Sequence, residues 1–459
     1  MTAMTYAADP TNAFVVDAVE PGARLRPGAS AAVIGVDLRL SISGLESYFF
    51  AQWQPALFDL FVVAAAAEYC DVVKRRPALG WARAFDVRVA VHDARLWREP
   101  AVKTALEDAL QFLTGDTWTF SFFDRLAGVA PVRQTSLSLE PTARVIMPYS
   151  DGLDSRAVAA IIGQTERGEL VRVRLGSRGA DHRAGRRRLP FTAVPYEVRV
   201  AKGHRRESSA RSRGFKFAVI TGIAARLANV DRIVVTESGQ GALGPVIAVT
   251  GHAYPDYRVH PAFTGRVERL FEALTGSSAR FEFPRIWNTK GETLRAASEL
   301  ASPPTWNDTR SCWQQSRQAA VSGRRRQCGI CAACLLRRMS MHAAGLAEAP
   351  DVYVWENLCA SEMREGAARD FALFTPALEQ YAIAGVLHLD HLAALPGSAI
   401  HARRLRSAAR ETAWALGEDT GEAEVKLVGL LERHRAEWRD FLGLLGPTSF
   451  IAKLASTRP

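Results

Sequence analysis

Strand-like and helical segments alternate along the middle of the chain, from about Arg144 onward, and this alternation constrains the fold more than any other feature. The runs "ARVIMPY", "ELVRVRLG", "YEVRV" and "DRIVVT" are typical of strands, whereas "DSRAVAAIIGQ" and "GFKFAVITGIAARLA" repeat apolar residues at helical spacing. Strands separated by helices pair in parallel through right-handed crossovers. The pattern therefore predicts a doubly wound parallel sheet of the α/β class, with a ligand site at the carboxyl ends of its strands.

The 459-residue chain is long for a single core, and its patterns divide it into three parts. Residues 1–140 mix strand-like and helical runs, which predicts an accessory α/β domain, and the polar segment 134–144 is expected to be a connector. Residues 141–345 hold the alternating pattern. Residues 346–459 are rich in Ala, Leu, Arg and Glu, which predicts amphipathic helices, interpreted as a packed accessory bundle rather than a nucleic-acid-binding arm.

The charge balance favours anionic partners. Lys and Arg number 58 against 48 acidic residues, a net charge of +10. Nucleotide phosphates and nucleic acid both fit this balance, and so does an ordinary arginine-rich solvated surface. Residues 1–30 contain acids and no uninterrupted apolar segment, which argues against a secretory signal, and the apolar stretch 57–67 is too short to span a bilayer. We therefore expect a cytoplasmic protein with no membrane partner.

The stretch "SDGLDS", Ser150–Ser155, lies between a predicted strand and a predicted helix. The first N–H groups of a helix have no partner within it, and the helix dipole favours an anion there. Gly152 allows the backbone to approach a ligand, and the hydroxyls of Ser150 and Ser155 can donate to phosphate oxygens. We interpret residues 150–155 as a phosphate loop, although a simply capped helix would give a similar pattern. The P-loop motif of NTPases is absent from the sequence.

Four of the six cysteines share one segment with the spacing Cys-x15-Cys-x2-Cys-x2-Cys, and these are Cys312, Cys328, Cys331 and Cys334. In a chain without an export signal, such clustering indicates metal binding rather than disulfides. Four thiolates can surround Zn²⁺ tetrahedrally, which predicts a structural zinc site, with an iron–sulfur cluster as the alternative. Arg337 and Arg338 are expected to offset negative charge there. Cys70 and Cys359 are expected to be buried as small hydrophobic side chains.

The loop and the cysteines together resemble one family. "SDGLDS" is similar to the "SGGxDS" loop of the PP-loop ATP pyrophosphatases, which adenylate a substrate and release pyrophosphate, although Asp151 stands where that family usually has Gly. The loop followed by "CGICAACLLR" resembles the QueC-type 7-cyano-7-deazaguanine synthases, and "YPDYR" and "PRIWNTKGE" match further elements of that family. The resemblance implies a PP-loop fold over residues 144–345.

The resemblance also implies ATP, Mg²⁺ and Zn²⁺ as cofactors and assigns roles to individual residues. The catalytic residues would be Asp154, Ser155 and Lys290. The ATP-binding residues would be Ser150, Asp151, Gly152, Leu153, Asp154, Ser155, Arg211 and Arg213. The substrate-binding residues would be Glu237, Tyr254, Asp256 and Arg258. Isolated arginines and acids are also common on solvated surfaces, so that interpretation stays open for them. Asp151 would repel a triphosphate unless Mg²⁺ lay between them.

The family's substrate, 7-carboxy-7-deazaguanine, has a carboxylate that adenylation makes reactive toward an amine. "AAAAEYCDVVKRR" and the segments after it resemble QueC-like proteins of bacterial antiphage operons, particularly the Qat system, in which the amine can be the N-terminus of a partner protein. We therefore expect an AMP- and pyrophosphate-forming ligase that joins the deazaguanine to a partner protein. The alternatives are the nitrile synthase of queuosine-precursor synthesis and a catalytically inactive nucleic-acid-binding or scaffold protein.

Overall fold

The computed structural model describes residues 12–49, 51, 54–77, 80–126, 143–150, 152–166, 169–175, 191–207, 210–249, 254–314 and 318–456. These residues divide into two compact units. The first unit lies within Met1–Tyr149, Thr165–Val235 and His252–Phe283, and the second within Ser150–Gln164, Thr236–Gly251 and Pro284–Pro459. Compactness thus divides the chain at positions other than residues 140 and 345, and the domain boundaries stay a prediction.

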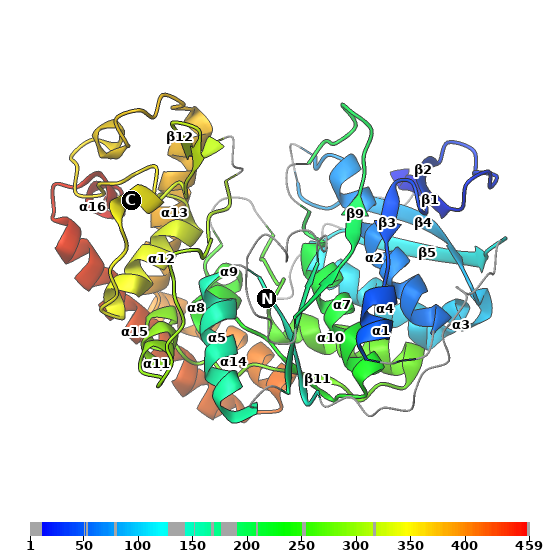
Figure 1. Ribbon diagram of the computed structural model, residues 1–459. Helices are drawn as coiled ribbons and strands as arrows, with labels where there is room; N and C mark the ends of the chain where they lie inside the picture. The colour runs from blue at the N-terminus through cyan, green and yellow to red at the C-terminus, as the bar shows by residue number, and fades with distance from the viewer. Residues whose placement is uncertain are drawn as a thin grey trace. The chain divides into compact units, whose positions relative to one another are not determined.

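The first unit begins with a four-stranded parallel sheet of order β2-β1-β4-β5 (Figure 1). Its strands are β1 (Phe14–Val19), β2 (Ser30–Val33), β4 (Ala84–Val91) and β5 (Thr117–Asp124). Helices α1 (Ser43–Tyr48), α2 (Pro55–Val73), α3 (Ala94–Arg98) and α4 (Pro100–Thr114) belong to the same region. Val87 of β4 lies opposite Val16 and Phe120, and all three are buried, so the sheet has an apolar face. The predicted N-terminal α/β architecture is confirmed.

A five-stranded sheet of order β11-β10-β6-β7-β8 follows, and all of its pairs are parallel. Its strands are β6 (Val145–Pro148), β7 (Leu170–Leu175), β8 (Phe191–Val194), β10 (Arg232–Val234) and β11 (Arg280–Glu282). Helices α7 (Arg213–Ala228) and α10 (Pro261–Thr275) pack against it. The strand order reverses between β6 and β10, the kind of switch point at which α/β proteins bind ligands. This confirms the predicted doubly wound parallel sheet.

One predicted strand pairs differently. "YEVRV" forms β9 (Tyr196–Val198), which pairs antiparallel with β3 (Leu38–Leu40), and β8 takes the edge of the parallel sheet instead. Pro195 separates β8 from β9 and has no N–H group to continue the ladder. The strand-like run "AAVIGVDLRLSI", residues 31–42 of the N-terminal part, is likewise divided, because a turn at Gly35, with φ of 85°, separates β2 from β3.

Helix α2 explains why the two sheets of the first unit share a core. The helix is mostly apolar and has buried residues on every side, including all of those from Phe61 to Ala67. It contacts β1 and β4 of the first sheet and α7 of the second. A helix that is hydrophobic all round has to be covered on all faces. One apolar cluster accordingly joins Phe61 of α2 to Val219 of α7 and Phe263 of α10.

The second unit is mostly helical, which confirms the helices predicted after residue 345 (Figure 1). Its larger helices are α5 (Leu153–Glu166, up to residue 164), α11 (Lys290–Ser298), α12 (Ala332–Ala343), α13 (Pro376–Ala394), α14 (Ala402–Leu416), α15 (Thr420–Leu445) and α16 (Phe450–Ser456). The short elements are α8 (Gly239–Ala242), α9 (Gly244–Ile247), β12 (Ala320–Val321), β13 (Arg324–Arg325), η3 (Pro350–Val352), η4 (Met363–Gly366) and η5 (Ala399–His401). Trp355, Leu389 and Trp438 belong to an apolar cluster in which α12, α13, α15 and α16 pack together.

Within the described residues, no single helix has both the length and the hydropathy needed to cross a bilayer. Pro376–Ala394 and Ala399–Leu416 meet those criteria only as a pair, on length and composition, and the pair is bent by 97°.

Candidate active site and metal centre

The phosphate loop leaves β6 and leads into α5, the place predicted for it. Ser150 and Ser155 face each other with their Oγ atoms 3.0 Å apart, and the N–H of Ser150 points to Ser155 Oγ at 3.2 Å. The N–H of Gly152 donates to Ser150 Oγ at 3.2 Å. Asp151 lies outside the described residues. The loop thus gathers hydroxyl and N–H groups beside the first turn of a helix, which is the donor set that an anion requires.

Leu153 attaches this loop to the interior of the second unit. It is fully buried in an apolar cluster with Ala157 of α5, Leu294 of α11 and Met341 of α12. Packing among helices holds the start of α5 more firmly than an exposed loop would be held. Because the side chain of Leu153 packs in this cluster, only its backbone could contact ATP. Binding of ATP by Leu153 stays a prediction.

Asp154 and Lys290 form a buried ion pair next to the loop. Lys290 Nζ donates to Asp154 Oδ2 at 2.6 Å, and Ser238 Oγ lies 3.4 Å from Asp154 Oδ1. The two side chains are only 11% and 8% exposed. Burial by itself lowers the pKa of Lys290, but the negative charges of Asp154 and Glu237 outweigh that effect, so its pKa is raised. Lys290 is therefore a cation at neutral pH, held beside the phosphate loop by a carboxylate of α5.

The segment that follows β10 completes this polar group. Thr236 Oγ1 lies 3.4 Å from Ser155 Oγ, and Ser238 Oγ donates to Thr293 Oγ1 of α11 at 3.1 Å. The carboxylate of Glu237 lies against Gly241, where a Cβ atom would be 2.2 Å from Glu237 Oε2. The sequence analysis did not select Thr236, Ser238 or Thr293. A signal was nevertheless present for Thr236 and Ser238, because these small polar residues lie at the end of a predicted strand and just after it.

The other predicted residues lie in the first unit, where they contact one another. Asp256 pairs with Arg258 at 2.6 Å and with Arg211 at 3.8 Å. Burial raises the pKa of Asp256, but the two arginines lower it to a value below the ordinary one. The hydroxyl of Tyr254 donates to the carbonyl of Phe112 at 2.8 Å. Asp256 is thus an anion with two cationic neighbours, and its predicted contact with a substrate stays a prediction, as does that of Tyr254 or Arg258.

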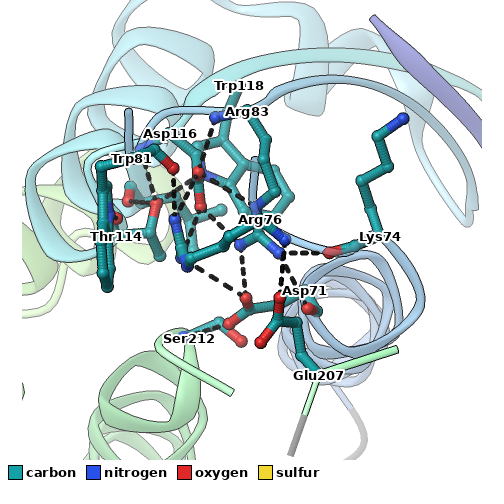
Figure 2. Close-up of polar contacts among 11 residues, drawn as sticks. Asp71, Lys74, Arg76, Trp81, Arg83, Thr114, Asp116, Trp118, Glu207 and Ser212 are labelled. Atoms are coloured by element: carbon teal, nitrogen blue, oxygen red, sulfur yellow. Dashed lines mark hydrogen bonds and ion pairs between the residues drawn. The ribbon is translucent and has the colours of Figure 1, made fainter. Parts of the chain in front are cut away.

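A buried network in the first unit fixes the segment that precedes α7, and sequence reasoning missed it. Figure 2 shows Arg76 and Arg83 directed at the carboxylates of Asp71 and Asp116. Arg83 Nη2 lies 2.5 Å from Asp71 Oδ1 and 2.7 Å from Asp116 Oδ2, and Asp71 Oδ2 accepts from the N–H of Ser212 at 2.7 Å. The one available signal was Asp71, one of three acids within a mostly apolar helical run.

The same network reaches the predicted ATP-binding arginines. The N–H of Arg76 also donates to Glu207 Oε1 at 2.6 Å, which holds Glu207 beside the residues that follow α2. The guanidinium groups of Arg76 and Arg211 lie over the ring of Trp81, at 4.0 and 4.8 Å from its centroid. Arg213 lies over Phe217, at 5.4 Å. Residues from the N-terminal part of the chain therefore position Arg211, while the binding of ATP by Arg211 and Arg213 stays a prediction.

The cysteine cluster is assembled as the spacing predicted. The Sγ atoms of Cys312, Cys328, Cys331 and Cys334 all lie within 4.8 Å of one another. Cys328 Sγ and Cys334 Sγ are 3.8 Å apart, and tetrahedral Zn²⁺ with Zn–S bonds of about 2.3 Å requires about that separation. The N–H of Cys328 donates to Cys312 Sγ at 3.2 Å, and the N–H of Cys331 to Cys328 Sγ at 3.4 Å. Four converging thiols, supported by backbone N–H groups, fit a zinc ion.

The side chains around the cluster only partly follow the predictions. Arg338 donates to the carbonyl of Trp355 at 2.6 Å, and Arg337 pairs with Glu348, so both arginines bind the segment after α12 to the metal site. Cys70 is buried, as predicted. Cys359 is exposed, so the prediction of burial was wrong for it, because it lies in a turn between η3 and η4.

Comparison with known proteins decides the family. The model of the family described as "Queuosine biosynthesis protein QueC" matches residues 222–345. A 7-cyano-7-deazaguanine synthase from Anaeromyxobacter sp. (strain Fw109-5) is 30% identical over 250 residues, which cover 48% of this chain and 99% of that protein. This chain belongs to the QueC family. A second 7-cyano-7-deazaguanine synthase, from Anaeromyxobacter dehalogenans (strain 2CP-C), is 26% identical over 220 residues, 45% of this chain and 89% of that protein. No solved structure matches.

The QueC family match divides the candidate site. It includes Glu237, Lys290 and the four cysteines, whereas the phosphate loop and residues 346–459 lie outside it. The polar group around Asp154 and Lys290 thus joins a helix within the matched QueC segment to a loop that precedes it. About half of the chain lies outside the stretch aligned with either synthase, so these parts need an explanation beyond the family.

Proposed function

We propose that this protein is an ATP-dependent enzyme that adenylates 7-carboxy-7-deazaguanine and transfers it to an amine. The observation behind this proposal is the buried pair of Asp154 and Lys290 beside the Ser150–Ser155 loop, in a chain of the QueC family. A fixed cation and a set of hydroxyl donors next to a helix start suit a reaction in which a phosphate group gains negative charge as it leaves.

The reaction has two steps. In the first step, a carboxylate oxygen of the substrate attacks the α-phosphorus of ATP, the bond to the β-phosphate breaks, and pyrophosphate leaves with the negative charge. In the second step, an amine nitrogen attacks the activated carbonyl carbon, AMP leaves, and the nitrogen loses a proton to give an amide. Atoms and charges balance without an oxidant or a reductant.

Each group of the site has a place in this scheme. The hydroxyls of Ser150 and Ser155 and the N–H of Gly152 would donate to the departing pyrophosphate. The ammonium of Lys290 would offset the charge on the phosphates, because its raised pKa keeps it protonated. Asp154 would hold Lys290 in place through the hydrogen bond at 2.6 Å.

Two metal ions accompany the proposal. Asp154 is the described carboxylate of the loop and would bind Mg²⁺ together with the ATP phosphates, since Mg²⁺ prefers carboxylate, phosphate and water oxygens. When bound, Mg²⁺ would neutralise phosphate charge. The four cysteines would hold Zn²⁺ in a structural role, because four thiolates leave no open position for a reacting group.

We propose the N-terminus of a partner protein as the amine. A protein acceptor is supported by the residues outside the region shared with the synthases, because the two alignments cover only 48% and 45% of this chain. A protein acceptor needs a docking surface, whereas ammonia does not. Membership of an antiphage system, and of the Qat group in particular, is part of this proposal, as is a cytoplasmic location.

A second candidate is synthesis of the nitrile from ammonia. It is favoured by the names of the two relatives, both 7-cyano-7-deazaguanine synthases. In that case the amide oxygen would attack the α-phosphorus of a second ATP and release pyrophosphate. The oxygen would then leave with AMP while the nitrogen loses two protons, which gives the nitrile.

One experiment tests the shared step and separates the acceptors. The purified protein is incubated with ATP and 7-carboxy-7-deazaguanine, and exchange of labelled pyrophosphate into ATP is measured. Exchange that depends on the carboxylate substrate is expected, and its absence would refute adenylation. Intact-mass spectrometry of a co-expressed neighbouring protein should then show an added deazaguanine. Free nitrile formed from ammonia, without any protein adduct, would decide for the second candidate.

A further inference from the structure

The first turn of α11, which begins at Lys290, is bound by helix α15 from the C-terminal part of the chain. Thr289 caps α11 and forms a capping box with Glu292, in which Thr289 Oγ1 accepts from the N–H of Glu292 at 3.1 Å. The hydroxyl of Thr289 also donates to Glu437 Oε1 of α15. Gly291 permits this approach, because a Cβ atom there would lie 2.7 Å from Glu437 Oε1.

Gln240 makes a second connection between the same helices. Its Oε1 accepts from the backbone N–H of Lys290 at 2.7 Å. Its Nε2 donates to His434 Nδ1 at 2.9 Å and to Glu437 Oε2 at 3.2 Å. His434 Nε2 in turn donates to the carbonyl of Leu389 at 2.8 Å, which fixes the tautomer with the proton on Nε2. Burial lowers the pKa of His434 to about 4, consistent with a neutral ring.

These contacts act on one point of the site. The cap residue before Lys290 and the backbone N–H of Lys290 itself are both held by side chains that meet at α15. A lysine in the first turn of a helix is opposed by the helix dipole, so the ammonium gains nothing from its own helix and depends on Asp154 and on a fixed helix start. A shift of this turn would move Nζ away from the carboxylate at 2.6 Å.

We propose that Glu437 and His434 are positioning residues, which act through Thr289 and Gln240 to hold Lys290 beside Asp154 and the phosphate loop. The proposal gives the C-terminal helices a role in the site, although they lie outside the family match at residues 222–345. It rests on the proposed function for its kinetic consequences but not for its geometry. Neither residue touches a reacting atom in this scheme.

The charges around Glu437 are consistent with this role. Burial is the main cause of the raised pKa of Glu437, which is about 7 with the lowering effect of the hydrogen bonds from Thr289 and Gln240 included. On α11, the charge of Glu292 also raises the pKa of Glu437, and the charge of Arg295 lowers it. Ala343 of α12 is a further close neighbour of Gly291 and carries no charge. His434 is neutral on the same helix. Both carboxyl oxygens of Glu437 accept hydrogen bonds, so a glutamine, with a single side-chain oxygen, keeps one of the two acceptors.

The test compares four variants by two readouts. Glu437→Ala removes both hydrogen bonds, Gly291→Ala displaces the carboxylate, and Glu437→Gln keeps one of the two acceptors and the length of the side chain. Glu432→Ala is the matched control, since Glu432 is exposed on the same helix. One readout is kcat and KM of ATP–pyrophosphate exchange. The other is the rate of reductive methylation of Lys290, followed by peptide mass spectrometry, and thermal unfolding monitored by circular dichroism confirms that each variant folds.

Glu437→Ala and Gly291→Ala are expected to lower kcat by about tenfold to a hundredfold, the usual effect of a small misplacement, with a smaller change in KM. Both should also speed the methylation of Lys290, which is 6% exposed in the wild type. Glu437→Gln, which keeps one acceptor, should lie between the wild type and Glu437→Ala in both readouts, and Glu432→Ala should stay near the wild type. Wild-type methylation rates in the folded Glu437→Ala and Gly291→Ala variants would overturn the proposal. Absence of exchange in the wild type would refute the proposed function alone, because methylation still tests the positioning.

Discussion

Substitution of Lys290 should lower the free energy of unfolding of the second unit, because its partner Asp154 would remain as an unpaired buried carboxylate. In Lys290→Met, the Asp154 carboxylate would remain in a site where it is 11% exposed and would lose its hydrogen bond at 2.6 Å. Breaking a buried ion pair on one side costs about 3–5 kcal/mol. Because Ser238 still donates to Asp154, at 3.4 Å, we expect the lower end, about 3 kcal/mol. That loss corresponds to a fall in Tm of roughly 6–12 °C for a domain of this size.

A double-mutant cycle separates the ion pair from ordinary packing. Asp154→Leu alone leaves an unpaired buried ammonium, whereas Lys290→Met with Asp154→Leu leaves no charge at all. The double variant should therefore be more stable than the sum of the single effects predicts, by at least about 1.5 kcal/mol, within the range measured for residues in contact. Additive effects, equal to within about 0.5 kcal/mol, would refute the argument that the two charges depend on each other.

The assay is thermal unfolding followed by circular dichroism, with ATP–pyrophosphate exchange measured on the same samples. Lys453→Met is the matched control, because Lys453 lies 3.7 Å from Glu362 in the same unit, and the two side chains are 49% and 72% exposed. An exposed pair of this kind contributes about 0–1 kcal/mol. The control should thus melt within a few degrees of the wild type and keep its exchange activity.

Four further predictions follow from single sites. Ser155→Ala removes a hydroxyl 3.0 Å from Ser150 Oγ and should slow ATP–pyrophosphate exchange by about a hundredfold, as for other oxyanion donors, with little change in Tm; exchange at the wild-type rate would contradict this role. Cys331→Ser should lower the zinc content, measured by plasma mass spectrometry, and lower Tm as well, because a structural metal contributes folding energy; a metal-free variant of full stability would exclude a structural metal. Burial raises the pKa of Glu437 from 4.5 to about 7, so the contribution of Glu437 to stability is complete below pH 4.5 and is lost as the pH rises through 7. The Tm of Glu437→Gln relative to the wild type should therefore rise between pH 5 and pH 8. A constant difference in Tm would contradict the raised pKa. Gly115 has φ of 68° and lies against the ring of Tyr254, so Gly115→Ala should cost about 1–2 kcal/mol from backbone conformation alone, measurable as a lower Tm.

Local features of this protein could be predicted from the sequence. The periodicity that defined "ARVIMPY" and "DSRAVAAIIGQ" is produced by short-range constraints, and both became β6 and α5. The four cysteines were predicted as one site because three of them lie within seven residues of one another in the sequence. Cys312 was included because it is the nearest other cysteine along the chain. The loop between β6 and α5 was predicted because a strand, a small polar turn and a helix follow one another directly in the chain.

Pairings between distant residues could not be predicted in this way. Nothing in the pattern around Asp71 or Asp116 indicates that Arg83 lies between them, since that contact depends on how β4, β5 and α2 pack. Hydropathy likewise marked "YEVRV" as a strand but not its partner, because a short strand pairs with whichever edge is adjacent. Asp256 is an intermediate case. Its partner Arg258 is two residues away, so an ion pair could have been considered alongside a ligand.

The C-terminal helices illustrate the same limit and also change how this part of the chain is understood. Amphipathic patterns after residue 345 predicted helices, but a pattern of faces does not reveal which polar residue meets a partner 148 positions earlier, as Glu437 meets Thr289. A buried helix start needs acceptors for its N–H groups and its capping hydroxyl. Here Glu437 accepts from that hydroxyl, and Gln240 bonds both Glu437 and Lys290. The apolar cluster of Trp355, Leu389 and Trp438 likewise joins α12, which carries Cys334, to α13 and α15. The C-terminal helices are therefore better described as part of the second unit's core than as an accessory bundle, because without them both the four-cysteine cluster and the turn at Lys290 would lose the groups they pack and bond against.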